Sequence, residues 1–200
     1  MQLIVLSAGR GSRLPSKFRN KPKCLVGLNS KPLLLHNIQF FYNFKKKILV
    51  SGYKQKYLSD ILKKNKFIND KNKKYSSTNM VYSLFLTKKL INEDVVIIYG
   101  DIIFDHKIYH LLNQKKNILP ININWLNNWK GRMSFKNILK DAENLFIKNK
   151  KLVEIGTKIK KNKLPKYQFM GIIKLRKNIF KKCYNFFFKL NDKKIDMTSF

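Results

Sequence analysis

A short apolar segment at residues 3–7 runs directly into a loop of small residues, and this junction restricts the possible folds more than any other part of the chain. An unbroken apolar strand is typical of a parallel sheet that is covered on both faces. The loop, Ala-Gly-Arg-Gly-Ser-Arg-Leu at residues 8–14, lets backbone N–H groups come close to an anion. Arg13 and, further along, Lys23 can neutralise phosphate oxygens. The junction therefore predicts an α/β protein that holds a phosphate-rich ligand.

Other glycine loops have residues that this one lacks. A dinucleotide-binding loop would have a third glycine where Leu14 stands and an acidic residue about twenty positions later, and neither is present. A Walker A loop needs Gly-Lys followed by Ser or Thr, which is also absent. A plain strand-to-helix turn stays open as an alternative, since Gly-x-Gly is a weak signal. That alternative does not account for the spacing of Arg13 and Lys23.

The rest of the chain alternates strand and helix patterns, as a mostly parallel sheet covered by helices requires. Apolar runs predict strands at residues 48–52 and 94–100, and apolar residues at helical spacing predict helices at 32–44, 57–64 and 79–90. We expect one domain, because 200 residues with 44% apolar side chains can bury one sizeable core. The predicted fold is a three-layer α/β sandwich with a mostly parallel central sheet.

The second half of the chain has a more antiparallel pattern. Residues 118–123 alternate between apolar and polar, 141–147 and 152–155 are patterned as the two arms of a hairpin, and 169–175 predict a further strand. Residues 178–189 have the aromatic content of a helix that packs on a core. The second half is therefore expected to differ in architecture from the first.

The net charge of +32 favours phosphate-rich partners without identifying one. The basic residues are mostly Lys and are spread along the whole chain together with Asn, Ile, Phe and Tyr, a mixture that an A/T-rich genome would also produce. A basic RNA-binding module is the rival from another function class, and it would need a contiguous Lys/Arg stripe with exposed aromatic residues. The scattered charge argues against it.

No segment predicts a membrane span, a secretory signal or a cysteine-based metal site. The chain has no run of about eighteen apolar residues, and its first residues lack the basic region and cleavage site of a signal peptide. Cys24 and Cys183 form neither a CxxC pair nor a disulfide framework. The spacing of His106 and His110 arises more often by chance than for metal binding. We therefore expect a soluble, cytoplasmic protein with reduced cysteines and no membrane partner.

The loop and the Pro-Lys pair that follows it resemble a known signature. Residues 8–14, together with Pro22-Lys23 and residues 24–26, are similar to the signature of the sugar-phosphate and phosphocholine nucleotidyltransferases, A-G-x-G-[ST]-R-[LF] with a downstream Pro-Lys. The spacing is kept, although Pro15 lies one position earlier than the proline that this family often has. The resemblance implies the nucleotide-diphospho-sugar transferase fold and a nucleotidyltransferase activity, but it does not choose the substrate.

Two later segments resemble the phosphocholine cytidylyltransferase-like branch of this NTP-transferase superfamily. Residues 75–84 look like the segment that enters the third helix beside the base, and residues 99–105 look like the strand end that holds the catalytic metal. The resemblance implies that Arg13, Lys23 and Asp101 act in catalysis, with Asp101 on Mg²⁺. The nucleotide-binding residues that it implies are Ser7, Ala8, Gly9, Gly11, Ser12, Arg13, Lys23, Thr78, Asn79, Ser83 and Gly100.

The role of Asp101 also has a physical rationale. Asp101 follows the apolar strand predicted at residues 94–100, so it should lie at the carboxyl end of the sheet, where α/β proteins place their ligands. A carboxylate is a suitable ligand for a Mg²⁺ ion that bridges phosphate oxygens. The alternative is that Asp101 only caps the next turn, which is the preferred interpretation of Asp105.

The family resemblance is weaker in the second half of the chain. The resemblance implies a nucleotide-binding half at residues 1–117 and an acceptor-binding half at residues 118–200 of the single domain. The acceptor-binding residues that it implies are Trp129, Arg132, Glu154, Tyr167 and Asp196. Aromatic residues such as Trp125, Trp129 and Tyr167 either form a cage for an ammonium head group, by cation–π attraction, or belong to the core, and both interpretations stay open.

Family members continue past the segment matched by residues 196–200 into a stretch with a second acidic metal ligand. This sequence ends first. Either it is a shortened form, or another carboxylate such as Asp196 substitutes, or metal binding is impaired. The sequence leaves these three alternatives open.

These features predict a Mg²⁺-dependent nucleotidyltransferase that transfers CMP from CTP to a small phosphorylated or phosphonylated acceptor and releases pyrophosphate. A sugar-1-phosphate uridylyl- or thymidylyltransferase is the enzymatic alternative, because the loop fits it equally well. The expected partners are CTP and the acceptor, with no specific nucleic acid. The oligomeric state is open, a homodimer included.

Overall fold

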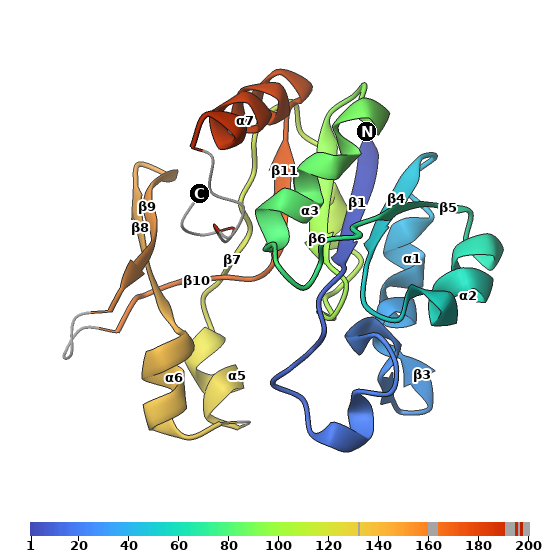
Figure 1. Ribbon diagram of the computed structural model, residues 1–200. Coiled ribbons are helices and arrows are strands. Elements are labelled where there is room, and N and C mark those ends of the chain that lie inside the picture. The colour runs from blue at the N-terminus through green and yellow to red at the C-terminus, as the bar shows by residue number, and fades with distance from the viewer. Residues whose placement is uncertain (132, 160–163, 191–194, 196, 198–200) are drawn as a thin grey trace.

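A five-stranded sheet forms the centre of the computed structural model (Figure 1), which describes residues 1–131, 133–159, 164–190, 195 and 197. Neighbouring strands follow the order β11-β6-β1-β4-β5, and only β11 runs antiparallel to its neighbour. The strands are β1 (Gln2–Ser7), β4 (Lys47–Ser51), β5 (Phe67–Lys71), β6 (Val95–Tyr99) and β11 (Ile172–Leu175). The prediction of a mostly parallel central sheet is confirmed.

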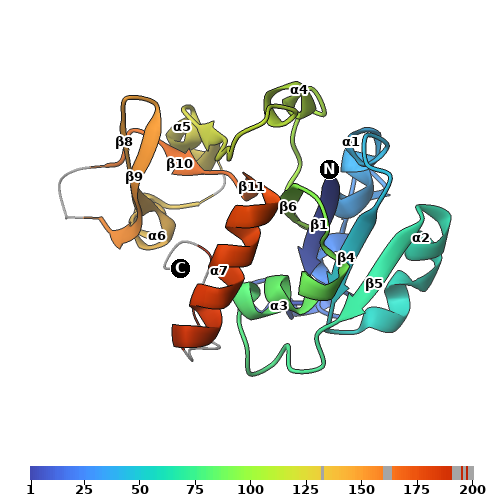
Figure 2. The same cartoon turned by 90° about the horizontal axis from the view of Figure 1, so that it is seen from above.

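Helices cover the sheet on both faces and complete the three layers (Figure 2). On one face, α1 and α2 share a core with Leu3 and Val5 of β1. On the other face, α3 and α7 share a core with Ile4 and Leu6. These helices are α1 (Ile38–Phe41), α2 (Ser59–Lys64), α3 (Met80–Leu86) and α7 (Lys177–Leu190), and the short 3-10 helices η3 (Leu33–Asn37), η4 (Gln55–Leu58) and η5 (Thr87–Leu90) adjoin the first three.

The remaining elements form a smaller lobe beside the sheet, at the left of Figure 1, and several short elements outside that lobe. The lobe contains β7 (Ile121–Asn122), α5 (Trp125–Lys130), α6 (Phe135–Asp141), the hairpin β8 (Glu143–Lys148) and β9 (Lys151–Lys158), and β10 (Gln168–Phe169). The other elements are η1 (Ser16–Phe18), η2 (Lys23–Leu25), β2 (Gly27–Leu28), β3 (Lys31–Pro32) and α4 (Ile108–Leu112). β11 and α7, which follow the lobe in sequence, return to the central sheet.

Three details of the predicted pattern are wrong. The strand predicted at residues 169–175 is two strands, because Gly171 has a φ of 80° and turns the chain between them. The predicted hairpin exists, but Asp141, at its expected start, is the last residue of α6. Of the strand predicted at 118–123, only Ile121–Asn122 forms a strand, with one bridge at Ile118.

β5 is a strand that the apolar pattern did not predict. It carries no apolar run because it lies at the sheet edge and buries only Phe67.

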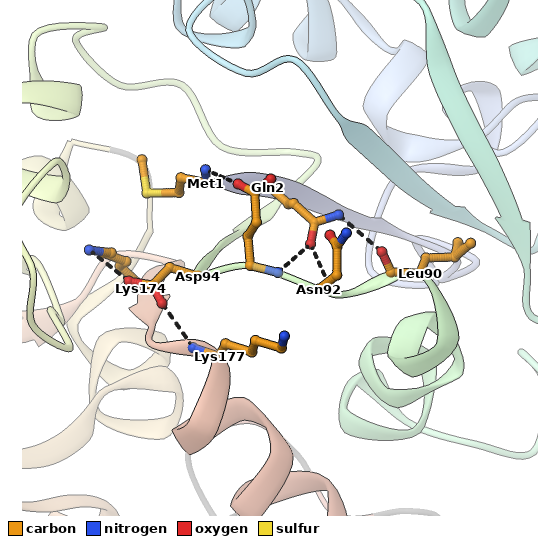
Figure 3. Close-up of polar contacts among 8 residues, drawn as sticks. Met1, Gln2, Leu90, Asn92, Asp94, Lys174 and Lys177 are labelled. Atoms are coloured by element: carbon orange, nitrogen blue, oxygen red, sulfur yellow. Dashed lines mark hydrogen bonds and ion pairs between the residues drawn. The ribbon is translucent and has the colours of Figure 1, made fainter.

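A buried glutamine ties the amino-terminal end of the sheet together (Figure 3). Gln2 is fully buried in β1, where its Nε2 donates to the Leu90 carbonyl at 3.0 Å and its Oε1 accepts the Asn92 N–H at 2.7 Å. Next to it, Asp94 accepts the Lys177 N–H at 3.0 Å and lies 3.6 Å from the Lys174 ammonium. The network joins the segment before β6 to β1, β11 and α7.

Among the helices that the described residues form, none combines the length and the apolar character that crossing a bilayer requires.

The buried glutamine predicts a stability effect. We expect Gln2→Ala to lower the free energy of unfolding by about 1–3 kcal/mol, because it removes a fully buried side chain and leaves partly buried backbone groups of residues 90–93 without their partner. Urea denaturation measures this value. Gln39→Ala is the matched control, since Gln39 is exposed. Equal denaturation midpoints for the two variants would show that the network contributes nothing.

Candidate nucleotide site

A cavity of about 450 Å³ opens at the carboxyl ends of β1 and β6. This is the edge at which open α/β sheets hold their ligands. The cavity is bounded by the first loop, by η2, by the start of α3 and by the residues after β6. Its lining residues are Leu6, Ser7, Ala8, Gly9, Arg10, Gly11, Ser12, Arg13, Leu14, Lys23, Cys24, Tyr75, Thr78, Asn79, Met80, Ser83, Tyr99 and Asp101.

The first loop owes its shape to Gly11. Gly11 has a φ of 63°, in the left-handed region that favours glycine, and its carbonyl accepts the Leu14 N–H at 2.9 Å. A Cβ at this position would lie 3.2 Å from the Leu14 side chain and 3.3 Å from the Lys23 Cβ. The turn therefore brings the loop against Lys23, so that residues far apart in sequence line one cavity.

Gly52, directly after β4, lets a second segment approach the loop. A Cβ on Gly52 would lie 2.6 Å from the Ala8 carbonyl oxygen and 2.7 Å from the Tyr75 Cβ, closer than real atoms come. The Tyr53 N–H also donates to the Ala8 carbonyl at 3.0 Å. The missing side chain at Gly52 is what allows Ala8 and Tyr75 to line the same cavity.

Two of the lining residues form an ion pair. The Lys23 ammonium lies 2.5 Å from Oδ2 of Asp101, with 43% and 28% of the two side chains exposed. Asp101 is the one carboxylate among the lining residues, and no group of three or more His, Cys, Asp or Glu that could hold a metal occurs in the part of the chain that the structure describes. A single hard oxygen donor fits a Mg²⁺ ion that takes most of its ligands from phosphates and water.

Two arginines bring further positive charge to the cavity. Arg13 is 89% exposed and lies 3.5 Å from Asp141 of α6, a weak contact that a stronger anion can displace. The Arg10 guanidinium lies 5.7 Å from the centre of the Tyr75 ring, within the range of a cation–π contact. The mouth of the cavity is therefore cationic and suited to a polyphosphate.

Cys24 lines the cavity but does not supply a nucleophile. Burial raises the pKa of its thiol to about 11, and the Asp101 carboxylate acts in the same direction, while a hydrogen bond with Ser7 opposes the shift. The thiol is therefore neutral at pH 7, and it is the thiolate that attacks. Cys24 is therefore not a candidate nucleophile in this cavity.

The structure brings most of the predicted site residues together. Of the predicted nucleotide and catalytic residues, all line the cavity except Gly100, which lies behind Ser7 and donates its N–H to the Leu6 carbonyl at 2.9 Å. The prediction assigned no role to Arg10, Tyr75 or Tyr99, which also line it. Their signal was weak, because a lone tyrosine or arginine beside a motif is common on any surface.

The predicted acceptor residues do not line this cavity. Trp129 lies on α5 with its ring 5.3 Å from that of Trp125, and Glu154 lies on β9, where it accepts a hydrogen bond from Asn144 at 3.3 Å. Trp125 is 2% exposed and donates its indole N–H to the Pro165 carbonyl, so it is a core residue. Tyr167 lies in the segment before β10. Arg132 and Asp196 lie outside the described residues.

Known proteins with similar sequences include two cytidylyltransferases and several bifunctional GlmU proteins, one of them from Methanococcus maripaludis at 28% identity over 184 residues, which covers 90% of this chain and 41% of that protein. The chain is 33% identical over 189 residues to CTP:phosphoglutamine cytidylyltransferase of Campylobacter jejuni, a match that covers 87% of this chain and 72% of that protein. It is 30% identical over 134 residues to choline-phosphate cytidylyltransferase of Streptococcus pneumoniae, covering 64% of this chain and 57% of the relative. No family model matches the sequence.

A solved structure with the same fold is the inositol-1-phosphate CTP transferase from T. maritima. It superposes with a TM-score of 0.76 over 99% of this chain and 78% of that one, at 19% sequence identity. At this identity the likeness establishes the arrangement of the layers and not the substrate.

The contact at Gly52 predicts a binding defect. We expect Gly52→Ala to weaken the binding of a nucleoside triphosphate by about tenfold or more, since the new methyl group must push Ala8 and Tyr75 apart, and tenfold corresponds to about 1.4 kcal/mol. Isothermal titration calorimetry measures the change. Gly27→Ala is the control, because a Cβ there meets nothing within 4 Å. Equal affinities in the two variants would place the triphosphate elsewhere.

Proposed function

The chain belongs to the NTP-transferase family of nucleotidyltransferases that includes the phosphoglutamine and choline-phosphate cytidylyltransferases, and on that premise we propose that it transfers CMP from CTP to a small phosphorylated or phosphonylated acceptor. In the proposed reaction, an oxygen of the acceptor attacks the α-phosphorus of CTP. A new P–O bond forms, the bond to the β-phosphate oxygen breaks, and pyrophosphate leaves.

One observation carries this proposal. The glycine loop, the Lys23–Asp101 pair and the start of α3 all border one cavity at the carboxyl edge of the sheet, although they come from distant parts of the sequence. Such a site combines backbone N–H groups and cations for phosphates with a single carboxylate for a metal. These groups serve phosphoryl transfer, in which positioning and charge neutralisation do most of the work.

Each side chain then has a defined task. Asp101 would hold Mg²⁺, which when bound neutralises charge on the phosphates. Lys23, within reach of the same carboxylate, would contact the α-phosphate oxygens, and Arg13 would leave Asp141 for the β- and γ-phosphates. Ala8 and Gly9 would contact the base and ribose, and Asn79 and Ser83 would border the base.

The acceptor is proposed to bind between this cavity and the smaller lobe. Arg13, from the nucleotide loop, and Asp141, from α6 of the lobe, lie 3.5 Å apart, which brings the lobe to the edge of the cavity. Trp129, Glu154 and Tyr167 belong to that lobe and are the proposed acceptor contacts. Two relatives are named for phosphoglutamine and choline phosphate, both of which are small phosphorylated molecules.

A matrix assay tests the proposed function. Pyrophosphate release is measured for CTP, UTP, dTTP and ATP, each with phosphocholine, phosphoethanolamine, 2-aminoethylphosphonate, a phosphoamide and a sugar 1-phosphate. We expect turnover with CTP and one of the first four acceptors. Turnover confined to UTP or dTTP with the sugar phosphate would replace the cytidylyltransferase assignment with the sugar-nucleotide alternative.

The proposed role of Asp101 predicts that replacing its carboxylate abolishes turnover and leaves the fold intact. We expect Asp101→Asn to reduce kcat by at least about a hundredfold, because the amide has the same shape but no charge to hold a metal. Asp105→Asn is the control, since Asp105 is exposed and accepts the Lys107 N–H at 2.9 Å. Comparable turnover of both variants would rule out Asp101 as the metal ligand.

The Lys23–Asp101 pair predicts weak metal binding in the absence of nucleotide. Lys23→Met removes the ammonium from the carboxylate, so affinity for Mn²⁺ alone should rise about threefold or more. Electron paramagnetic resonance of free Mn²⁺ measures the change. Lys17→Met, which removes an ammonium next to Phe18, is the control. Unchanged Mn²⁺ affinity in Lys23→Met would mean that the Lys23 ammonium does not compete with the metal for the Asp101 carboxylate.

A further inference from the structure

A buried amide lies behind the base end of the cavity. Asn72 follows β5 directly, is 1% exposed, and donates its backbone N–H to the Ser51 carbonyl at 2.8 Å. Its side-chain oxygen accepts the backbone N–H of Lys74 at 2.8 Å. Since a backbone N–H can only donate, this contact fixes which end of the amide is oxygen. The Asn72 Nδ2 therefore faces the opposite way, toward α3.

Both hydrogens of this Nδ2 have acceptors. One goes to the Thr78 hydroxyl at 3.0 Å and the other to the Ser83 hydroxyl at 2.9 Å. Asn72 thereby ties the beginning of the 72–79 loop to its end and to the first turn of α3. Thr78, Asn79 and Ser83 all line the cavity. Asn72 binds the Thr78 and Ser83 side chains directly, and Asn79 is the residue after Thr78.

The Thr78 and Ser83 hydroxyls differ in whether their own hydrogen has a good acceptor within the protein. Thr78 donates to the Lys74 carbonyl at 2.8 Å, a normal hydrogen bond, so its proton is used within the loop. Among the described residues, the acceptor for the Ser83 proton is the Asn79 carbonyl, at 3.4 Å, which is longer than the usual range for a hydroxyl donor. Because Asn72 already donates to the Ser83 oxygen, the Ser83 proton is directed away from Asn72 and is available to a better acceptor in the cavity.

We propose that Asn72 is a positioning residue for nucleotide choice: it fixes the Ser83 hydroxyl as a hydrogen-bond donor to the base. This inference rests on the proposed function, because it takes the base end of the cavity to lie at Ser83. A donor at that place favours a base edge with acceptors. Both bases accept a hydrogen bond at O2, and they differ at N3, which is an acceptor in cytosine and carries a hydrogen in uracil, so the proposal places the Ser83 hydroxyl opposite N3. The arrangement therefore selects CTP over UTP, a role that Asn72 plays without touching the nucleotide.

Reversal of the amide polarity tests the proposal. In Asn72→Asp the shape is kept, but the carboxylate can only accept, so it draws the Ser83 proton out of the cavity. The dissociation constants of CTP and UTP are measured by calorimetry with Mg²⁺ and no acceptor. We expect the preference of the wild type for CTP over UTP to fall by about tenfold. Asn65→Asp is the matched control, since the Asn65 amide donates only to the Ile61 carbonyl within α2 and its loop.

A double-mutant cycle separates positioning from a general loss of structure. If Asn72 acts through Ser83, then Ser83→Ala alone should lose the CTP preference, and adding Asn72→Asp to it should change the preference by less than about twofold. A CTP preference that survives in Ser83→Ala overturns the proposal, whether or not the Asn72 variant folds. Independent, multiplying effects of the two substitutions overturn it as well.

The experiment also distinguishes this inference from the proposed function. A wild type that prefers CTP in binding, and loses the preference as described, but releases no pyrophosphate with any acceptor keeps the inference and refutes the transfer reaction. A wild type that turns over CTP but binds CTP and UTP equally refutes the inference alone. A protein that binds neither nucleotide refutes both.

Discussion

Burial of β1 on both faces is the constraint on which the other elements depend. Leu3, Ile4 and Val5 are fully buried, and the strand lies between β4 and β6 with parallel pairing on each side. Alternate residues of one strand therefore belong to two different cores, which commits helices to both faces. Because the strand cannot turn without exposing one of these cores, its carboxyl end is fixed, and so is the loop that begins there.

Ion pairs at the ends of the strands let several cations line the cavity without destabilising the fold. Lys23 is neutralised by Asp101, and Arg13 lies near Asp141, so the charges at the cavity mouth have partners before any ligand arrives. Neither pair is deeply buried, and partly exposed pairs exchange partners at small cost in free energy. A triphosphate can take both cations, which leaves the carboxylate of Asp101 for a metal.

Parts of the fold and site followed from local patterns. The strands at β1, β4 and β6 are unbroken apolar runs, and α7 has an aromatic periodicity, so the sequence predicts them to within a few residues. The glycine loop and Lys23 keep the spacing of the family signature, and Asp101 directly follows the apolar segment at residues 94–100. By contrast, β5 is an edge strand with polar residues, α5 and α6 are short, and Gly171 interrupts a pattern that otherwise continues as one strand. Edge position and backbone conformation leave little trace in composition.

The sequence by itself determined the layers of this protein and singled out the cations that are proposed to bind phosphate, because buried parallel strands and a glycine turn each demand particular residue types in a fixed order. Only the tertiary structure decided which of the other residues meet at the site. Tyr75 reaches the cavity because Gly52 leaves room for it, and Asn72 acts on Ser83 because β5 ends beside α3. Such contacts join segments that no local pattern relates, since they depend on the distance between strand ends in the folded sheet.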